Sequence, residues 1–367
     1  MVGPGWPVLI VAEAGVNHGG DPARARDLVR AAAAAGADAI KFQTFRPELL
    51  VRPSAPTAAY QRGAGEGPGQ MEMLSRLSLD PAELEGLFDL ARGLGLVPLS
   101  TPFDPVSADL LDRLGVPAFK VSSGDLGYLP FIEYLAAKGR PLVLSTGMAG
   151  LQEVARAVRA ARSAGCRELV LLQCTSAYPA APEDANLRCL GTLSRAFGVP
   201  VGFSDHTPGV EAALAAVALG ASVLEKHLTL DRSLPGPDQA ASMEPQDFER
   251  MVRSVRVVEQ ALGSPQKRRL PSEEDVARAA RRGLVALRPI RRGEALRPEA
   301  VGALRPAEGL EPRHLPQVLG RRARRDIAAG EPLTWEMFRR GAGRCGAARE
   351  AAAPPQDSAA RGAGAHA

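Results

Sequence analysis

The hydrophobic pattern of the first 263 residues alternates between short apolar runs and longer amphipathic stretches. The first run, Val8 to Ala12, is typical of a buried strand, and it passes into the polar loop Glu13 to Gly20. Asp21 and Pro22 then predict a helix start, with Asp as the N-cap and Pro at the first helical position. The helix is expected over 23–35, and a unit of this kind recurs along the chain.

Eight apolar runs are predicted to be strands, and each ends in polar residues before the next helical stretch. They lie at residues 8–12, 37–42, 96–100, 118–121, 142–144, 169–173, 201–203 and 223–226. This alternation predicts a closed (β/α)8 TIM barrel, an α/β fold. An open doubly wound sheet is the alternative, but it concentrates its polar loops at one crevice. The long insertion 47–79, with its Gly-rich segment, is expected to be a mobile loop over the open face.

The pattern changes after the predicted barrel domain, residues 1–263. Residues 264–282 are a charged, Pro-containing linker. Residues 283–341 form a small module in which Ile290–Glu294 is repeated as Ile327–Glu331, which predicts a pseudo-symmetric β fold. Residues 342–367 are rich in Ala, Gly and Pro, as in a disordered tail.

The charge divides along the same boundary. Residues 264–367 hold 21 basic and 12 acidic residues, a net charge of +9, whereas the preceding 263 hold 24 and 29, a net charge of −5. The basic part could bind nucleic acid, an anionic substrate or an acidic neighbouring subunit. Few aromatic residues accompany its arginines, which argues against single-stranded nucleic acid.

The four cysteines show no C-x-x-C spacing, so neither a zinc knuckle nor a disulfide framework is indicated. There is no run of 18 apolar residues and no leader-like N-terminus, so the sequence predicts a soluble, cytoplasmic protein without a membrane partner.

Two histidines, His206 and His227, follow successive predicted strands directly. A single histidine at a strand end is more often a satisfied polar residue than a ligand. Because the carboxyl ends of barrel strands meet on one face, two such imidazoles in successive units favour a divalent metal site.

Lysines inside predicted strands are unusual at buried positions and must find an anion. Serines and carboxylates lie near the same strand ends. The serines could merely cap helices, but together with the lysines they resemble a phosphate cradle. The lysines are Lys41, Lys120 and Lys226, the serines Ser123, Ser145 and Ser204, and the carboxylates Glu13, Asp125, Glu225 and Asp238.

Eight ordered motifs resemble those of the sialic acid synthase family, the N-acetylneuraminate synthases and their relatives. The resemblance covers Val8 to about Arg340, and its last part resembles the family's antifreeze-like (SAF) domain. The motifs are Ala12–His18 (AEAGVNH), Lys41–Gln43 (KFQ), Ser100–Asp104 (STPFD), Lys120–Ser123 (KVSS), Ser145–Met148 (STGM), Phe203–Thr207 (FSDHT), Glu225–His227 (EKH) and Asp231–Asp238 (DRSLPGPD).

The resemblance implies a transferase that condenses phosphoenolpyruvate with an open-chain N-acetylated sugar, such as N-acetylmannosamine, and water to give a 2-keto acid and phosphate. His206 and His227 would bind the metal, typically Mn²⁺, with Mg²⁺ or Co²⁺ as alternatives. Phosphoenolpyruvate would be held by Lys41, Thr101, Lys120, Ser123, Ser145 and Ser204, and Ser176 would be a further substrate-binding residue. The residues that would face the sugar or handle protons are Glu13, Gln43, Asp125, Tyr178 and Asp238. Arg305 would complete the sugar site of a partner in a domain-swapped homodimer.

Two departures from the family pattern leave the acceptor open. Many members have Glu at the position of Asp125, and some have Asn at that of Ser176. A 6-deoxy di-acetamido sugar, giving a legionaminic or pseudaminic type of acid, and a step in spore-coat polysaccharide synthesis are therefore alternatives to N-acetylmannosamine. A non-catalytic protein that binds polysaccharide or nucleic acid is the alternative from another class.

Overall fold

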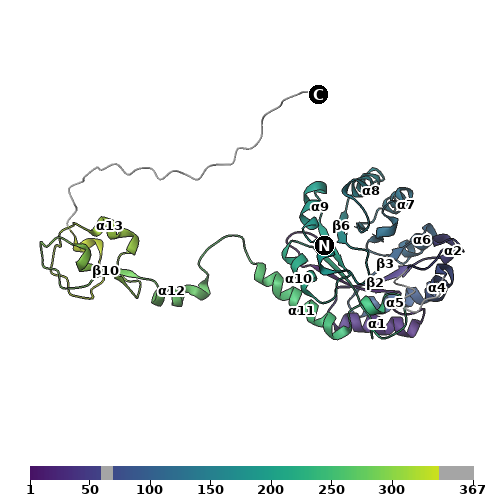
Figure 1. The fold of residues 1–367 in the computed structure, drawn as a ribbon, viewed down its shortest axis with the longest axis horizontal. Helices are drawn as coiled ribbons and strands as arrows, with labels where there is room; N and C mark the ends of the chain where they lie inside the picture. Colours follow the sequence, from purple (N-terminus) through teal and green to yellow (C-terminus); the bar gives the residue numbers. More distant parts are fainter. Residues whose placement is uncertain (59–68, 339–367) are drawn as a thin grey trace, which may run out of the picture. The chain divides into compact units, whose positions relative to one another are not determined.

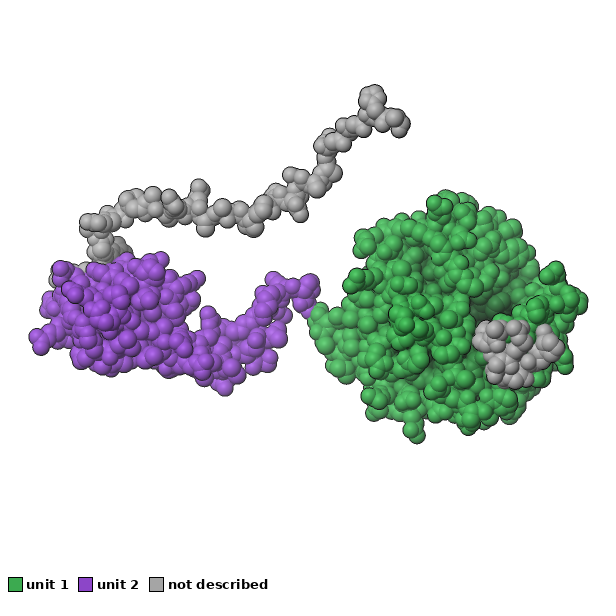
Figure 2. Space-filling model, viewed as in Figure 1, with its two compact units in different colours: residues 1–263 green, residues 264–367 purple. Residues whose placement is uncertain are grey.

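The computed structural model describes residues 1–58 and 69–338, and it divides into two compact units. Unit 1 comprises Met1–Gly263 and unit 2 comprises Ser264–Ala367 (Figure 2). The predicted disordered tail and the Gly-rich part of the insertion lie outside the described residues. Among the helices described, none combines the length and the apolar character that a membrane crossing requires.

Unit 1 is built on eight strands in the hydrogen-bonded order β3-β2-β1-β8-β7-β6-β5-β4, and every paired neighbour is parallel. β3 and β4 also lie side by side. The eight strands thus form a nearly closed barrel ringed by helices (Figure 1), so the predicted TIM-barrel fold is confirmed. The strands are β1 Leu9–Gly15, β2 Ala39–Thr44, β3 Val97–Pro102, β4 Phe119–Val121, β5 Leu142–Ser145, β6 Leu169–Cys174, β7 Val201–Asp205 and β8 Val223–His227.

The helices surround the strands (Figure 1), and their buried apolar residues pack against the barrel. Helix α1 begins as the sequence predicts, with Asp21 Oδ1 accepting from the backbone N–H of Ala23 and Pro22 in the first turn. The helices are α1 Pro22–Ala34, α2 Pro47–Leu50, α4 Gln70–Leu77, α5 Pro81–Gly93, α6 Pro105–Arg113, α7 Leu129–Ala136, α8 Leu151–Ser163, α9 Cys189–Phe197, α10 Glu211–Ala218 and α11 Pro245–Leu262.

The insertion 47–79 differs from the mobile loop that the sequence predicts, because its described part contains α2 and α4. Met73 and Leu77 of α4 are buried against Val16 and Phe45, which follow β1 and β2. The apolar residues of α4 recur at helical spacing, and their burial holds the helix beside the open end of the barrel.

The inside of the barrel is filled by residues that alternate along each strand. A lower layer is apolar and includes Val11, Ala39, Leu99, Leu172 and Val223. Strand side chains alternate between the two faces of a sheet, so the residues two positions further on also point inward. These residues include Glu13, Lys41, Thr101 and Glu225, so a polar, partly charged layer lies next to the apolar one.

Unit 2 contains α12 Glu274–Ala280 in the predicted linker, the antiparallel strands β9 Gly283–Ala286 and β10 Val301–Leu304, and α13 Leu315–Val318. The repeated segments pair with each other, since Ile290 and Ile327 exchange two backbone hydrogen bonds of 2.9 Å. In each repeat a glutamate, Glu294 or Glu331, accepts from the backbone N–H three residues before it at 2.9 Å. The repeated sequence thus builds one turn twice.

Candidate active site at the carboxyl end of the barrel

A cavity of about 520 Å³ opens at the carboxyl ends of the barrel strands. Thirteen of the fifteen predicted site residues line it. They are Glu13, Lys41, Gln43, Thr101, Lys120, Ser123, Ser145, Ser176, Tyr178, Ser204, His206, His227 and Asp238. The structure therefore brings together residues that are up to 225 positions apart in the sequence.

Two predicted site residues do not line this cavity. Asp125 lies in a short 3-10 turn after β4, where its Oδ2 accepts from Ser122 Oγ at 2.6 Å. Burial raises the pKa of the Asp125 carboxyl despite that hydrogen bond. Arg305 lies in unit 2, where it is exposed.

The alternation of the strands explains why these side chains converge. Glu13 pairs in register with Lys41 on β2 and with His227 on β8, and it lies two residues after the inward-facing Val11. Ser204 is likewise in register with Glu225. Each of these residues continues the inward-facing set of its own strand, so the polar layer is a direct product of strand geometry.

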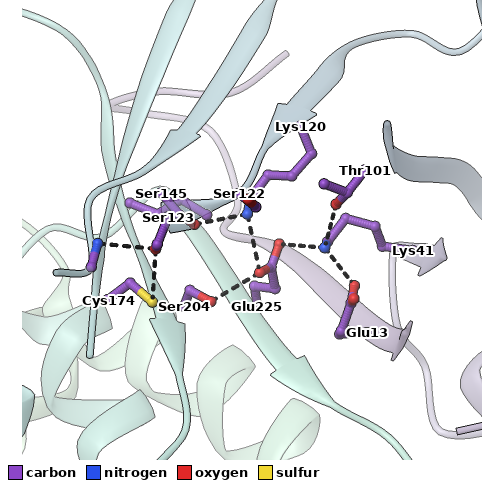
Figure 3. A network of polar contacts seen from close by, with 12 residues as sticks. Glu13, Lys41, Thr101, Lys120, Ser122, Ser123, Ser145, Cys174, Ser204 and Glu225 are labelled. Carbon is purple, nitrogen blue, oxygen red and sulfur yellow. Dashed lines mark hydrogen bonds and ion pairs between the residues drawn. The ribbon is translucent and has the colours of Figure 1, made fainter. Parts of the chain in front are cut away.

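Two lysines share one carboxylate at the centre of the cavity (Figure 3). Nζ of Lys41 and Nζ of Lys120 each lie 3.5 Å from an oxygen of Glu225. Lys41 also pairs with Glu13 at 2.6 Å and donates to Thr101 Oγ1 at 3.1 Å.

Hydroxyl groups complete this network (Figure 3). Lys120 donates to Ser145 Oγ at 2.7 Å, and Ser204 donates to Glu225 at 2.9 Å. The lysines and Glu225 are all less than a tenth exposed, so the network is a buried set of two positive and, with Glu13, two negative groups.

The two carboxyl groups have opposite pKa shifts. Burial raises the pKa of Glu13 to about 7, although Lys41 opposes the shift. Burial also disfavours ionised Glu225, but Lys120, Lys41 and the Ser204 hydroxyl outweigh it and lower the pKa of Glu225 to about 2. Glu225 is therefore a fixed anion, whereas Glu13 can bind or release a proton near neutral pH.

The third strand lysine, Lys226, lies on the opposite face of β8 from Glu225 and His227. It is 3% exposed and pairs with Asp205 at 2.8 Å. It also donates to the carbonyl of Thr207. The anion that the sequence requires for Lys226 is thus supplied by the protein, outside the cavity.

The two histidines lie next to each other, with ring centroids 5.3 Å apart. His206 Nδ1 lies 2.8 Å from the carbonyl of Thr175, so Nδ1 carries a proton and Nε2 is the nitrogen that remains for a ligand. His227 Nδ1 is buried without a hydrogen-bond partner and lies 3.8 Å from Asp238 Oδ2. Burial, His206 and Lys41 lower the pKa of His227 well below its usual range, which keeps that imidazole neutral.

These features fit a divalent cation, since a neutral imidazole with an unused nitrogen is a metal ligand. Within residues 1–58 and 69–338, no group of three or more His, Cys, Asp or Glu side chains is arranged as a metal site. An ion held by His206 and His227 would therefore take its remaining ligands from substrate or water. Asp238, whose pKa burial raises to about 6, could be a further proton carrier beside it.

Ser123 and Ser176 lie around Gly147. The Gly147 N–H donates to Ser123 Oγ at 3.0 Å, and Ser123 Oγ donates to Cys174 Sγ at 3.6 Å. A Cβ at Gly147 would come within 2.4 Å of Ser176 Oγ, so the close approach of these hydroxyls requires glycine.

Comparison with known proteins gives the family. The profile of the NeuB family matches residues 28–267, and that of the SAF domain matches residues 281–339. The chain belongs to the NeuB family.

Named relatives of this NeuB-family chain are similar over most of its length. An N,N'-diacetyllegionaminic acid synthase of Legionella pneumophila is 41% identical over 91% of this chain and 95% of its own. The N-acetylneuraminate-9-phosphate synthase of Mus musculus is 40% identical over 74% of this chain and 76% of its own. The crystal structure of an N-acetylneuraminic acid synthetase from Leptospira borgpetersenii, in complex with citrate, is 33% identical, has a TM-score of 0.66, and matches 75% of this chain and 92% of that one.

Two further residues line the site, and the sequence-based assignment gave neither of them a specific role. The sequence predicted only that Glu225 lies on this face of the barrel. Glu225 can bridge Lys41 and Lys120 because it points into the barrel, whereas its neighbour Lys226 points outward. Cys174 ends an apolar run, and its Sγ lies 3.9 Å from His206 Nδ1. The two-residue period of β6 could have identified Cys174 as inward-facing.

Proposed function

We propose that this protein condenses phosphoenolpyruvate with an open-chain N-acetylated aldose and water, in a metal-dependent reaction. A C–C bond forms between C3 of phosphoenolpyruvate and the aldehyde carbon, water adds at C2, and phosphate leaves to give a 2-keto acid. The observation that carries the proposal is the buried pair Lys41 and Lys120, neutralised by the protein's own carboxylates, beside two adjacent imidazoles in one cavity.

The residues of the central network would bind the anionic groups of phosphoenolpyruvate. Lys41 and Lys120 can turn from Glu225 towards the substrate, while the hydroxyls of Thr101, Ser123, Ser145, Ser176 and Ser204 donate to its oxygens. Glu225 would keep the two ammonium groups charged and in place when no substrate is bound. The arrangement is preorganised, because the ions are already desolvated in the free protein.

Glu13 is the proposed proton carrier. Its pKa of about 7 allows it to hold a proton or to accept one at neutral pH, and it lies 2.6 Å from Lys41. A divalent ion on His206 and His227, with Mn²⁺ proposed and Mg²⁺ or Co²⁺ as alternatives, would supply a Lewis acid for the aldehyde oxygen. Gln43, Tyr178 and Asp238 would orient the acceptor.

The wall of the cavity favours one class of acceptor. Apolar side chains of α4 and its neighbours also line the cavity: Val16, Met73, Leu74, Leu77 and Phe103. This surface suits the methyl groups of a 6-deoxy sugar with two acetamido groups better than a chain of free hydroxyls. We therefore place a diacetamido 6-deoxy aldose ahead of N-acetylmannosamine, and the name of the Legionella relative agrees with that choice.

Arg305 and the second subunit are part of the proposal. Unit 2 is basic and unit 1 is acidic, so unit 2 could cover the barrel of a partner and bring Arg305 to the acceptor. Such a domain-swapped homodimer would be dissociated or inactivated by charge reversal at unit 2. Analytical ultracentrifugation of the full chain, with Arg305→Ala assayed beside it, tests this part.

The function is tested by phosphate release with phosphoenolpyruvate and a panel of aldoses, with and without chelator. We expect acceptor-dependent and metal-dependent release, faster with the diacetamido 6-deoxy sugar than with N-acetylmannosamine. His206→Ala should abolish it. Release without any acceptor, or full activity of His206→Ala, would refute the proposal, and tight salt-sensitive polyanion binding without turnover would favour the non-catalytic alternative.

A further inference from the structure

The turn after β1 carries a buried amide that the proposed chemistry does not use. Asn17 is 2% exposed and does not line the cavity. Its Nδ2 nevertheless donates to the carbonyl of Leu228 at 2.9 Å and to Ser242 Oγ at 2.8 Å. The backbone carbonyl of Asn17 accepts from Gln239 Nε2 at 2.9 Å. One residue of the turn thus makes three hydrogen bonds to a segment more than 200 positions away.

All three hydrogen bonds reach the β8–α11 loop, residues 228–244. The base of this loop is closed by its own backbone, since Met243 N donates to the carbonyl of His227 at 2.9 Å and Thr229 N donates to that of Met243 at 3.0 Å. Inside it, the Thr229 hydroxyl donates to Gln239 Oε1. The loop is therefore a closed unit, and Asn17 attaches that unit to the end of β1.

The attachment leads to the cavity through one further hydrogen bond. Ser242 Oγ, which accepts from Asn17, donates to the carbonyl of Asp238 at 2.6 Å. Asp238 lines the cavity, and its carboxylate lies 3.8 Å from His227. Two hydrogen bonds in series thus connect the amide of Asn17 to the backbone of Asp238.

We propose that Asn17 is a positioning residue that holds the β8–α11 loop, and with it Asp238, at the acceptor end of the cavity. This inference rests on the proposed function, in which Asp238 faces the acceptor sugar. None of the three hydrogen bonds goes to β2, β4 or β5, which carry Lys41, Lys120 and Ser145. Loss of Asn17 should therefore affect the acceptor and spare phosphoenolpyruvate.

The kinetic test measures KM for each substrate in Asn17→Ala. Removal of two neutral buried hydrogen bonds should raise KM for the acceptor about tenfold, with KM for phosphoenolpyruvate changed less than about twofold. Ser242→Ala removes the two hydrogen bonds made by Ser242 Oγ but keeps the one from Asn17 to the carbonyl of Leu228, so it should give a smaller rise. Because the two residues act in series, the double variant should be no worse than Asn17→Ala. Equal rises in both KM values, or additive effects, would overturn the inference.

Arg256→Leu is the matched control, since Arg256 donates to the carbonyl of Val8 at 2.9 Å and pairs with Asp38 at 2.6 Å, at the opposite end of the barrel. Arg256→Leu should lower the free energy of unfolding, and it should leave the ratio of KM for the acceptor to KM for phosphoenolpyruvate unchanged. Should Asn17→Ala not fold, Ser242→Ala carries the kinetic test.

Hydrogen exchange of the substrate-free protein gives a readout that does not depend on activity. Asn17→Ala should speed exchange of residues 228–243 and leave β4 and β5 unchanged. Unchanged exchange at 228–243 would refute the proposed role of Asn17 in holding the β8–α11 loop, even in an active enzyme. Faster exchange there, in a protein whose wild type has no turnover, would instead refute the proposed function.

Discussion

Replacement of Glu225 by glutamine tests the central network directly. Glu225→Gln keeps the shape of the side chain and can still accept from Ser204, but it removes the anion shared by Lys41 and Lys120. At an effective dielectric constant of about 20, an ion pair at 3.5 Å contributes about 5 kcal/mol before desolvation. The cost of burying the Glu225 charge cancels part of this energy. Because the substitution leaves two buried ammonium groups without their shared anion, we expect a net destabilisation of about 3–5 kcal/mol.

Thermal unfolding measures this loss. For a barrel of this size, 1 kcal/mol corresponds to about 2–4 °C, so the midpoint should fall by about 10 °C. Inorganic phosphate or phosphoenolpyruvate supplies the missing negative charge and should stabilise Glu225→Gln more than the wild type, in a comparison at equal ionic strength.

The control is Asp112→Asn, which removes the carboxylate of a half-exposed pair with Arg140 at 2.6 Å and should cost about 1 kcal/mol or less. A midpoint shift in Glu225→Gln no larger than that of Asp112→Asn would refute our reading of the buried charges. So would equal stabilisation of Glu225→Gln and the wild type by phosphate.

Three further predictions concern residues around the site. Burial lowers the pKa of His18 to about 4, so the neutral imidazole contributes about 3 kcal/mol to the free energy of unfolding above pH 6.5, and this is lost as the pH falls towards 4. Denaturant unfolding of His18→Asn should therefore show a flatter pH dependence between pH 6.5 and 4 than that of the wild type. Gly202→Ala places a Cβ 2.5 Å from a carbonyl of β8 and should destabilise the fold, whereas Gly86→Ala, inside α5 with nothing within 4 Å, should stabilise it by about 0.5–1 kcal/mol; opposite signs in thermal unfolding are required. Lys120→Met should abolish binding of phosphoenolpyruvate measured by calorimetry, whereas Lys226→Met should lower stability and leave that binding intact, and a loss of binding in both would contradict the assigned faces of β4 and β8.

Local sequence determined the strands, the helix starts and the position of the polar layer. Each depends on interactions between near neighbours: the Asp21 cap acts within one turn, and a strand ends where its apolar run meets polar residues. In a parallel barrel all these ends meet on one face, so nine of the thirteen predicted residues that line the cavity could be named from their places near strand ends. The resemblance to a known family, and not the strand pattern, added Gln43, Thr101, Ser176 and Tyr178.

Only the tertiary structure decided which neighbour of a pair faces the cavity and which distant segments meet. Glu225 and Lys226 are both charged and both in β8, and the register with β1 and β7 determines that Glu225 bridges two lysines while Lys226 pairs with Asp205. The burial of α4 beside Val16 likewise depends on a contact between separate segments. Asn17 reaches Ser242 across 225 positions, a distance that local propensity does not encode, because such contacts form only when the barrel closes.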